Sequence, residues 1–308
     1  MLPLAQRHLK VRIGPSGIHL FNRTTGLNLL IDEVRVAPAL WARAPRQVSI
    51  ALTNECDLAC PHCFAPKNPA SLEFERLINL LDELDENGCL GIGFGGGEPT
   101  LYPCLVELCR YATQHTGLAV TLTTHAHRLD DGLLAGLAGS VHFLRVSMDG
   151  VGDTYEAHRG RPFAAFLWHI KKIRSVVPFG INYVVNSHTL PDLDVATTLA
   201  AELGAIEFLL LPEQPVQGND GIDDRTAGAL QQWVTRYKGG VPITISQAGA
   251  DGLPVCNPLA GESGVRAYAH IDASGNLKRS SFDHDGVPIG AGGLMRALSL
   301  LGQKEVRL

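Results

Sequence analysis

The feature that most constrains the fold is an alternation of strand and helix patterns between residues 47 and 212. Short apolar runs of strand length recur there six times, and amphipathic stretches with helical spacing lie between them. This alternation predicts a parallel sheet covered by helices, an α/β fold that we expect to curl into a partial (β/α)6 TIM-like barrel. The strands, with the turns that follow them, are expected at 47–54, 89–99, 119–124, 142–150, 179–186 and 205–212, and the helices at 72–88, 103–115, 130–138, 163–175 and 191–203.

Polar motifs follow four of the predicted strands. The cysteine-rich run CDLACPHCF follows the first strand, GGGEP ends the second, TTH ends the third and SMDG ends the fourth. Because the carboxyl ends of parallel strands meet at one edge of a sheet, we expect the functional residues to gather at that rim.

Two smaller regions flank the predicted barrel, which we place at residues 46–246. Residues 1–45 are expected to form an N-terminal β element, with a hairpin around a Gly-Pro-Ser-Gly turn, and a proline-containing linker. Residues 247–308 are expected to form a small α+β cap, with two strands around an Ala-Ser-Gly-Asn turn and a closing helix at 291–301.

Composition excludes several classes of protein. The 308 residues are 45% hydrophobic and 19% charged, which indicates a globular chain, and no run approaches the roughly 20 apolar residues of a membrane span. A net charge of −5 argues against a general affinity for nucleic acid or for anionic membranes. The seven cysteines and the lack of a signal-peptide pattern predict a cytoplasmic protein with reduced thiols.

Three of the seven cysteines, Cys56, Cys60 and Cys63, lie within eight positions. Thiolates are soft ligands that suit zinc, copper(I) and iron–sulfur clusters. A structural zinc site needs four ligands, and this loop adds only His62 and Asp57 as weak candidates. Three thiols instead suit a [4Fe-4S] cluster with one iron open to an outside ligand. From the cysteines alone, a zinc loop or a chance cluster remains an alternative.

The Cys-x3-Cys-x2-Cys spacing after the first strand, followed by GGGEP, resembles the radical SAM (radical S-adenosylmethionine) superfamily over roughly residues 46–212. The resemblance implies a [4Fe-4S] cluster held by Cys56, Cys60 and Cys63, and SAM bound at the open iron. It also implies an enzyme that cleaves SAM reductively to a 5′-deoxyadenosyl radical, which abstracts hydrogen from a substrate.

Further positions match the motifs of that family and are expected to bind SAM. Gly96, Gly97 and Glu98 match the turn that binds the amino group, and His62 matches the residue near the adenine. Each match also has a plain structural explanation, such as a turn or a surface ion pair. The remaining expected contacts are Thr124 at the third strand end, Ser147 and Asp149 to the ribose and carboxylate, Arg159 to the carboxylate, Asn186 to the ribose, and Leu210 through its backbone to the adenine.

The C-terminal region resembles the twitch or SPASM cap of some radical SAM enzymes, which binds an auxiliary cluster. Here Cys256 precedes the strand–turn–strand, but Ser280 and Ser281 stand where a later cysteine is expected. The resemblance therefore predicts a cap that lacks a full ligand set for the auxiliary cluster. Cys256 is then either a leftover ligand or the thiol that returns hydrogen to a substrate radical.

Loss of an auxiliary electron acceptor favours a redox-neutral reaction, an epimerisation or rearrangement of a sugar or peptide with Cys256 as hydrogen donor. The nearest alternative is a peptide (RiPP) maturase or dehydrogenase. A rival of another class is a non-enzymatic scaffold that binds zinc or a cluster. The expected partners are a small-molecule or peptide substrate and an electron donor such as flavodoxin or ferredoxin, with no nucleic acid and no membrane.

Overall fold

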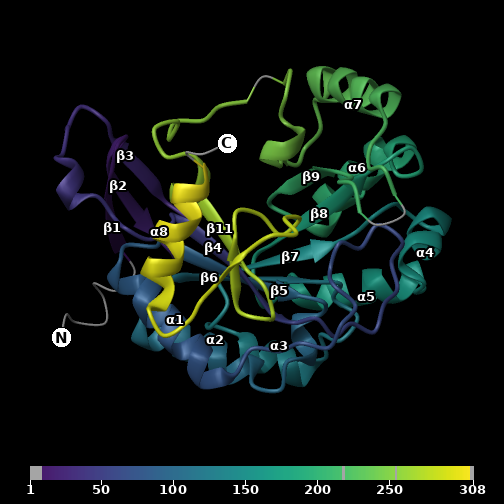
Figure 1. Ribbon diagram of the computed structural model, residues 1–308. Coiled ribbons are helices and arrows are strands. Elements are labelled where there is room, and N and C mark those ends of the chain that lie inside the picture. Colours follow the sequence, from purple (N-terminus) through teal and green to yellow (C-terminus); the bar gives the residue numbers. More distant parts are fainter. Residues whose placement is uncertain (1–8, 217–218, 254, 306–308) are drawn as a thin grey trace.

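The computed structural model describes residues 9–216, 219–253 and 255–305 and is built around one curved, mostly parallel sheet (Figure 1). The first and last few residues of the expected N-terminal element and cap lie outside the described residues. The sheet has the order β10-β9-β8-β7-β6-β5-β4-β11-β12-β13, and it does not close on itself. Its strands are β4 (Gln47–Thr53), β5 (Gly91–Gly96), β6 (Ala119–Thr124), β7 (Phe143–Ser147), β8 (Phe179–Val185), β9 (Phe208–Pro212), β10 (Ile243–Ile245), β11 (Tyr268–Ile271), β12 (Asn276–Lys278) and β13 (Val287–Pro288).

Helices follow the strands and wrap around the outside of the sheet. In Figure 1, α1 to α3 lie along the lower edge and α4 to α7 follow on the right. Among the described residues, no helix is both long enough and apolar enough to cross a bilayer. The helices are α1 (Phe74–Glu86), α2 (Leu105–His115), α3 (Asp131–Leu137), α4 (Asp153–Arg159), α5 (Phe163–Ile173), α6 (Leu193–Leu203), α7 (Asp224–Arg236) and α8 (Gly293–Glu305), with short 3-10 turns η2 (Pro38–Leu40), η3 (Pro99–Leu101), η4 (Leu190–Asp192), η5 (Gln247–Gly249) and η6 (Gly264–Arg266).

The six parallel strands predicted from the sequence are present as β4 to β9. Their apolar residues pack against the helices: Ile50, Ile92 and Phe94 have no exposed surface, and α1 buries a leucine stripe beside them. Strand β9 begins at Phe208, three positions later than expected. The open sheet with outer helices confirms the partial barrel.

Helix α4 was not expected. It has seven residues, enters through Gly152 at a φ of 56° and ends at Gly160 in the left-handed conformation. A helix of two turns carries too short an apolar pattern to be recognised by periodicity. Its position matters, because it brings Arg159 back toward the strand ends.

Both ends of the sheet recruit strands from beyond the six-strand series. β11 and β12 come from the region expected as a cap, and β11 pairs in parallel with β4. At the other end, β10 pairs in parallel with β9. The expected strand–turn–strand is present as β11 and β12, and its first strand is continuous with the barrel sheet.

A separate three-stranded antiparallel sheet precedes the barrel. It consists of β1 (Leu9–Gly14), β2 (Gly17–Asn22) and β3 (Asn28–Ile31), and the β1–β2 pair is the predicted hairpin. Two buried arginines of this sheet bind backbone carbonyls just before barrel strands begin. Arg12 donates to the carbonyls of Ala44, Gly88 and Arg266, and Arg23 donates to those of Thr113, Thr116 and Leu118.

These contacts place the N-terminal sheet at the amino-terminal end of the barrel. Figure 1 agrees, because β1 to β3 lie on the left and the β7 arrow points to the right. Arg12 also forms an ion pair with Glu262, 3.0 Å from Nε to Oε1, and both side chains are at most 5% exposed. The pair therefore joins the first strand to the loop before β11.

We predict that Arg12→Met lowers the free energy of unfolding by about 3–5 kcal/mol, because it leaves the Glu262 carboxylate buried with a weaker partner. The double variant Arg12→Met/Glu262→Gln should recover part of this loss. Urea unfolding measures both, and Arg35→Met in the exposed segment after β3 is the matched control. A loss below about 1 kcal/mol for Arg12→Met would show that the pair is not structurally important.

A hydrogen-bonded group joins β4 to β11. Ser49 Oγ lies 2.5 Å from the Tyr268 hydroxyl and 2.7 Å from His270 Nδ1. Burial lowers the pKa of His270 to about 4, and the charge of Lys278 acts in the same direction. The imidazole is therefore neutral in the folded protein at neutral pH.

We predict that His270 contributes to acid sensitivity. A histidine in the unfolded chain takes a proton near pH 6.5, whereas the folded state resists protonation until about pH 4. Protonation of His270 therefore favours unfolding. Between these two pH values, this one group should lower the free energy of unfolding by at most about 1.4 kcal/mol for each pH unit of acidification. In His270→Gln this part of the slope should vanish in urea titrations at several pH values, and in His115→Gln, at an exposed position, it should stay. Equal slopes in wild type and His270→Gln would contradict the assignment.

Candidate active site

Cys56, Cys60 and Cys63 lie on the loop that leaves the carboxyl end of β4. All three are free thiols and half-buried. Burial raises the pKa of the Cys56 and Cys60 thiols, although the Arg159 guanidinium opposes this at Cys60. The loop therefore presents three soft ligands, and at Cys56 and Cys60 burial disfavours the thiolate form until a cation binds.

The glycine turn after β5 packs directly against this loop. A Cβ on Gly96 would lie 2.2 Å from the Thr53 carbonyl oxygen, and one on Gly97 would lie 2.1 Å from the Glu55 carbonyl oxygen. Gly96 also has a φ of 130°, which other residues rarely adopt. These glycines therefore permit a close approach between the turn and the start of the cysteine loop.

Glu98 ends the turn and ties it to the end of β6. Its carboxylate, 1% exposed, accepts hydrogen bonds from Thr124 Oγ1 at 2.7 Å and from the backbone N–H of His125 at 3.0 Å. Thr100 donates to the same carboxylate through its backbone and its hydroxyl. Glu98 and Thr124, both predicted site residues, are thus brought together, and their contacts fix the β5 and β6 ends in one position.

His125 connects this group to the cysteine loop. Its Nε2 lies 2.8 Å from Asp57 Oδ1, and Asp57 also pairs with Arg128 and Arg161. Burial would raise the pKa of Asp57, but the hydrogen bond and charge of His125 outweigh it and lower that pKa. Ligand atoms of Cys56, Asp57 and His125 lie within 4.8 Å of one another, so they form an alternative set for a metal ion.

Asp149 is the centre of the second group. Its Oδ1 accepts a hydrogen bond from the backbone N–H of Val184 at 2.8 Å, and its Oδ2 pairs with His62 at 3.0 Å and with Arg159. Arg159 also donates to Cys60 Sγ at 3.6 Å. His62, Asp149 and Arg159, all predicted from the sequence, therefore meet beside a predicted cluster ligand.

The charges in this group reinforce one another. Burial alone would raise the pKa of Asp149, but Arg159 and His62 hold it well below its usual range. Burial also opposes the charge on Arg159, yet Asp149 raises the pKa of that guanidinium. The pair is charged at any physiological pH, with an arginine poised over the cysteine loop.

Three buried nitrogen atoms around this pair lack a hydrogen-bond partner among the described residues: His62 Nδ1, His158 Nδ1 and Arg159 Nε. Buried polar atoms are nearly always paired in folded proteins, so these atoms indicate a polar ligand. Three free thiols beside unpaired nitrogen atoms fit a [4Fe-4S] cluster and the carboxylate and heteroatoms of SAM.

Three other predicted residues lie on β7 and β9 or just after β8. Ser147 ends β7, opposite Asn182 of β8. Asn186 follows β8, and its side-chain oxygen accepts hydrogen bonds from the backbone N–H groups of His188 and Thr189. The Leu210 carbonyl accepts one from Ser246, so this backbone oxygen takes part in the β9–β10 edge.

Cys256 lies apart from these groups. It is an exposed thiol on the loop between β10 and β11. The other cysteines behave as small apolar side chains: Cys89 and Cys109 are fully buried, and burial raises their pKa values to about 11 and about 12.

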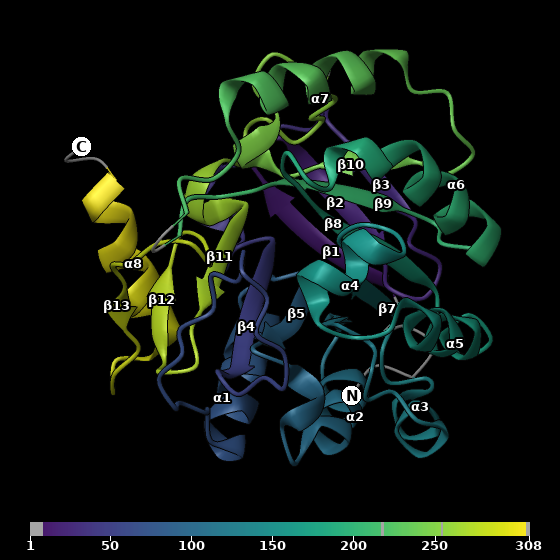
Figure 2. The ribbon, with the colours of Figure 1, turned by 90° about the vertical axis from the view of Figure 1, so that its right-hand side faces the viewer.

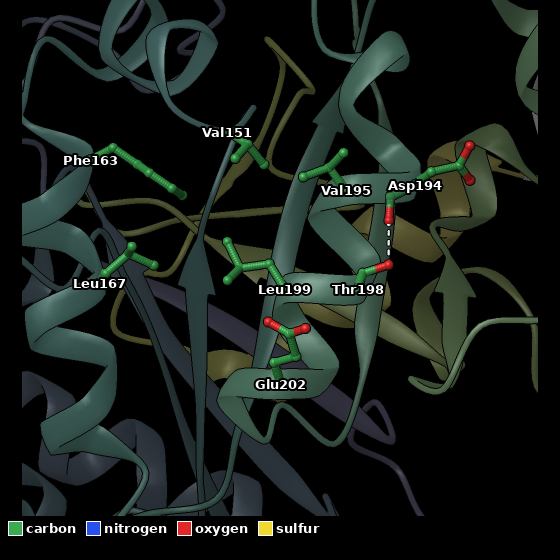
Figure 3. A pocket seen from close by; sticks show the side chains of 8 residues that line it. All are labelled: Val151, Phe163, Leu167, Asp194, Val195, Thr198, Leu199 and Glu202. Atoms are coloured by element: carbon green, nitrogen blue, oxygen red, sulfur yellow. Dashed lines mark hydrogen bonds between the residues drawn. The ribbon is translucent and has the colours of Figure 1, made fainter.

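Two hollows accompany the fold. A polar one of about 250 Å³ lies between the cysteine loop and the end of α4, where Asp57, Arg159 and Arg161 line it. Figure 2 views the molecule from the side toward which β7 points in Figure 1, with α4 in front. A more apolar one of about 540 Å³ lies between α5 and α6, and none of the predicted site residues lines it (Figure 3). Its lining residues are Val151, Phe163, Leu167, Asp194, Val195, Thr198, Leu199 and Glu202.

Several polar residues of the site were not predicted from the sequence. His125 appeared only as the last residue of the TTH motif, and Asp57 only as a weak zinc ligand. Arg161 and His158 flank a predicted residue, and the density of histidines and arginines around Arg159 was the available signal. Their contacts could not be inferred, because they depend on how α4 folds back.

Comparisons with known proteins agree with this geometry. Residues 50–196 match the model of the Radical SAM superfamily. An AdoMet-dependent heme synthase of Methanosarcina barkeri is 33% identical over 202 residues, 62% of this chain and 58% of that protein. The mycofactocin maturase MftC of Mycobacterium ulcerans is 31% identical over 199 residues, 61% of this chain and 53% of that protein. The chain thus spans little more than half the length of these relatives.

The fold is also shared with a solved structure. The crystal structure of Streptococcus suis SuiB bound to precursor peptide SuiA matches with a TM-score of 0.75 and 15% identity, covering 95% of this chain and 87% of that chain. At this identity the likeness concerns the fold alone. With the cysteine loop and the strand-end residues in place, residues 50–196 form a domain of the Radical SAM superfamily, whose cofactors are a [4Fe-4S] cluster and S-adenosylmethionine.

Proposed function

We propose that this radical SAM enzyme modifies a peptide, with Cys56, Cys60 and Cys63 as the ligands of its cluster. When bound, the cluster and SAM supply a 5′-deoxyadenosyl radical that abstracts hydrogen from the substrate. The observation that carries the peptide assignment is the 31% identity to a mycofactocin maturase over 199 residues. This favours the peptide alternative over epimerisation of a sugar.

Small residues on the inner face of the sheet favour a bulky substrate. Ile92 and Phe94 of β5 point outward into the core, so Gly91, Gly93 and Gly95 point inward. The inward positions of the next strand, β6, include two threonines. Small side chains therefore border the inner face beside the cysteine loop, which leaves room for a large side chain of a peptide.

In this proposal the chain's own residues bind and orient SAM. Arg159, held by Asp149, offers a fixed guanidinium to the SAM carboxylate, and such pairs favour the planar, two-pronged geometry of arginine. His62 and His158 have unpaired Nδ1 atoms that can bind the other polar groups of SAM. Glu98 acts by position, because its carboxylate holds the glycine turn against β6.

The single cysteine of the C-terminal region supports one cluster per chain. Ser280 is hydrogen-bonded to Asp283, and Cys256 is the only cysteine after residue 109. A single thiol in this region does not ligate a second cluster that could accept an electron, which favours a redox-neutral modification. Cys256 as hydrogen donor remains a prediction, and its exposed loop would have to approach the substrate.

A second candidate function follows from the other relative, a heme synthase with 33% identity. With this function, the barrel would bind a porphyrin rather than a peptide. The two candidates share the SAM-binding residues and differ only in the substrate, so one assay separates them.

One test of the proposed function measures cofactor content and substrate class. Protein reconstituted without oxygen should hold about four irons per chain and form 5′-deoxyadenosine with dithionite and SAM. Synthetic peptide pools should accelerate this formation, whereas nucleotide sugars and coproporphyrin should not. Zinc without SAM cleavage would reject the enzyme; stimulation by a sugar or a porphyrin alone would reject the peptide assignment. The triple variant Cys56→Ala/Cys60→Ala/Cys63→Ala is the negative control.

A separate prediction concerns the role of Arg159 in SAM binding. Arg159→Met should weaken SAM binding at least about tenfold, because it removes the guanidinium and leaves the buried Asp149 carboxylate with only His62 and the Val184 N–H as partners. Arg159→Lys should lose less, since it keeps a charge but not the two-pronged contact. Equilibrium dialysis with labelled SAM on cluster-loaded protein measures both.

The matched control is Arg161→Met, at a side chain that is 42% exposed and pairs with Asp57 instead. It should bind SAM nearly as well as wild type. If Arg159→Met bound SAM as tightly as Arg161→Met, the proposed carboxylate contact would be wrong.

A further inference from the structure

The N-terminal sheet turns its polar face toward the barrel and its aliphatic face toward solvent, which is the reverse of an ordinary surface sheet. Side chains alternate between the faces along each strand. The face that contacts the barrel carries Lys10, Arg12 and His19, and Arg12 and His19 are buried. The charged and polar side chains therefore point inward, where Arg12 and Lys10 pair with Glu262 and Asp85.

The outward face is aliphatic across the three strands except for Asn22, which the register places opposite Leu9. The register places Val11 opposite Leu20, and Leu20 opposite Leu29. A second row contains Ile13, Ile18 and Ile31, which are paired in the same way. Leu9, Val11 and Leu29 remain 49%, 54% and 50% exposed, so this face is open to solvent.

This outward face, the β1–β3 apolar face, is large for a monomer. Its seven aliphatic side chains and the exposed Leu27 beside it leave an apolar patch of roughly 500 Å², at the upper end of what monomers carry. Standard interfaces bury about 800 Å² on each partner, so this patch with its rim has the size of the core of such an interface.

We propose that the β1–β3 apolar face is an interface between two copies of this chain. Two such sheets would pack face to face about 10 Å apart and form a small sandwich across a twofold axis. The face carries no charged side chain, and the side-chain oxygen of Asn22 at its edge already accepts hydrogen bonds from the backbone N–H groups of Thr24 and Thr25. It can therefore meet an identical surface without burying an unpaired charge. A partner recognised by charge would find nothing on this face to bind.

The position of the face is compatible with this assembly. Arg12 and Arg23 attach the sheet to the amino-terminal end of the barrel, whereas the cysteine loop leaves the carboxyl end of β4. A twofold contact through β1 to β3 therefore points the two cysteine loops away from each other and leaves both open to substrate.

The test is the oligomeric state of cluster-loaded protein between about 1 and 100 µM, by sedimentation velocity and by light scattering after size exclusion. Wild type should associate to a dimer in this range. Val11→Glu and Leu29→Glu should each raise the dissociation constant at least about tenfold, because a carboxylate would be buried in the contact. Val195→Glu in α6, at a side chain that is 59% exposed, is the matched control and should leave the dimer intact.

Circular dichroism and iron content check that the variants fold. If the variants do not fold, amide hydrogen exchange of the wild type is measured instead, at the lowest and highest concentrations of the range. The amides of β1 to β3 should then be better protected from exchange at the higher concentration. A wild type that stays monomeric, or a dimer that survives both glutamates in folded protein, overturns the proposal. A monomer would leave a peptide or another protein as the occupant of the face.

Discussion

The Asp149 carboxylate is the contact on which the candidate site depends. It receives a hydrogen bond from β8, a contact at 3.0 Å from His62 of the cysteine loop and an ion pair from Arg159 at the end of α4. A carboxylate that is 1% exposed would be strongly destabilising without such partners. Three segments that are distant in the sequence must therefore assemble around one charge, and Cys60 is placed by the same arginine.

Glu98 plays the corresponding part on the other side of the cysteine loop. Its carboxylate joins the β5 and β6 ends, and His125 extends the contact to Asp57. The loop is thus bordered by two buried carboxylates with defined partners, although its thiols are only half-buried. This arrangement suits a cofactor site, since the ligands must be reachable while the groups around them are fixed beforehand.

The sequence was sufficient for the parts that depend on local pattern. The strands β4 to β9 follow apolar runs, and the rim follows from parallel pairing, so the cysteine loop and Asp149 could be placed on the same edge. The pairing of β11 with β4 could not be derived, because it depends on a register between segments more than 200 residues apart. The Arg159–Cys60 contact was also out of reach, since α4 is too short to show a helical period.

The N-terminal sheet shows why pattern alone can mislead. Its alternation of aliphatic and polar residues indicates strands correctly, but the usual rule assigns the aliphatic face to the interior. Here the backbone carbonyls that precede β4, β5 and β11 need donors, and Arg12 supplies them from the polar face. Once the arginine face is committed to the barrel, the aliphatic face must point outward. The β1–β3 apolar face is therefore a consequence of how the backbone carbonyls at the amino-terminal end of the barrel are hydrogen-bonded.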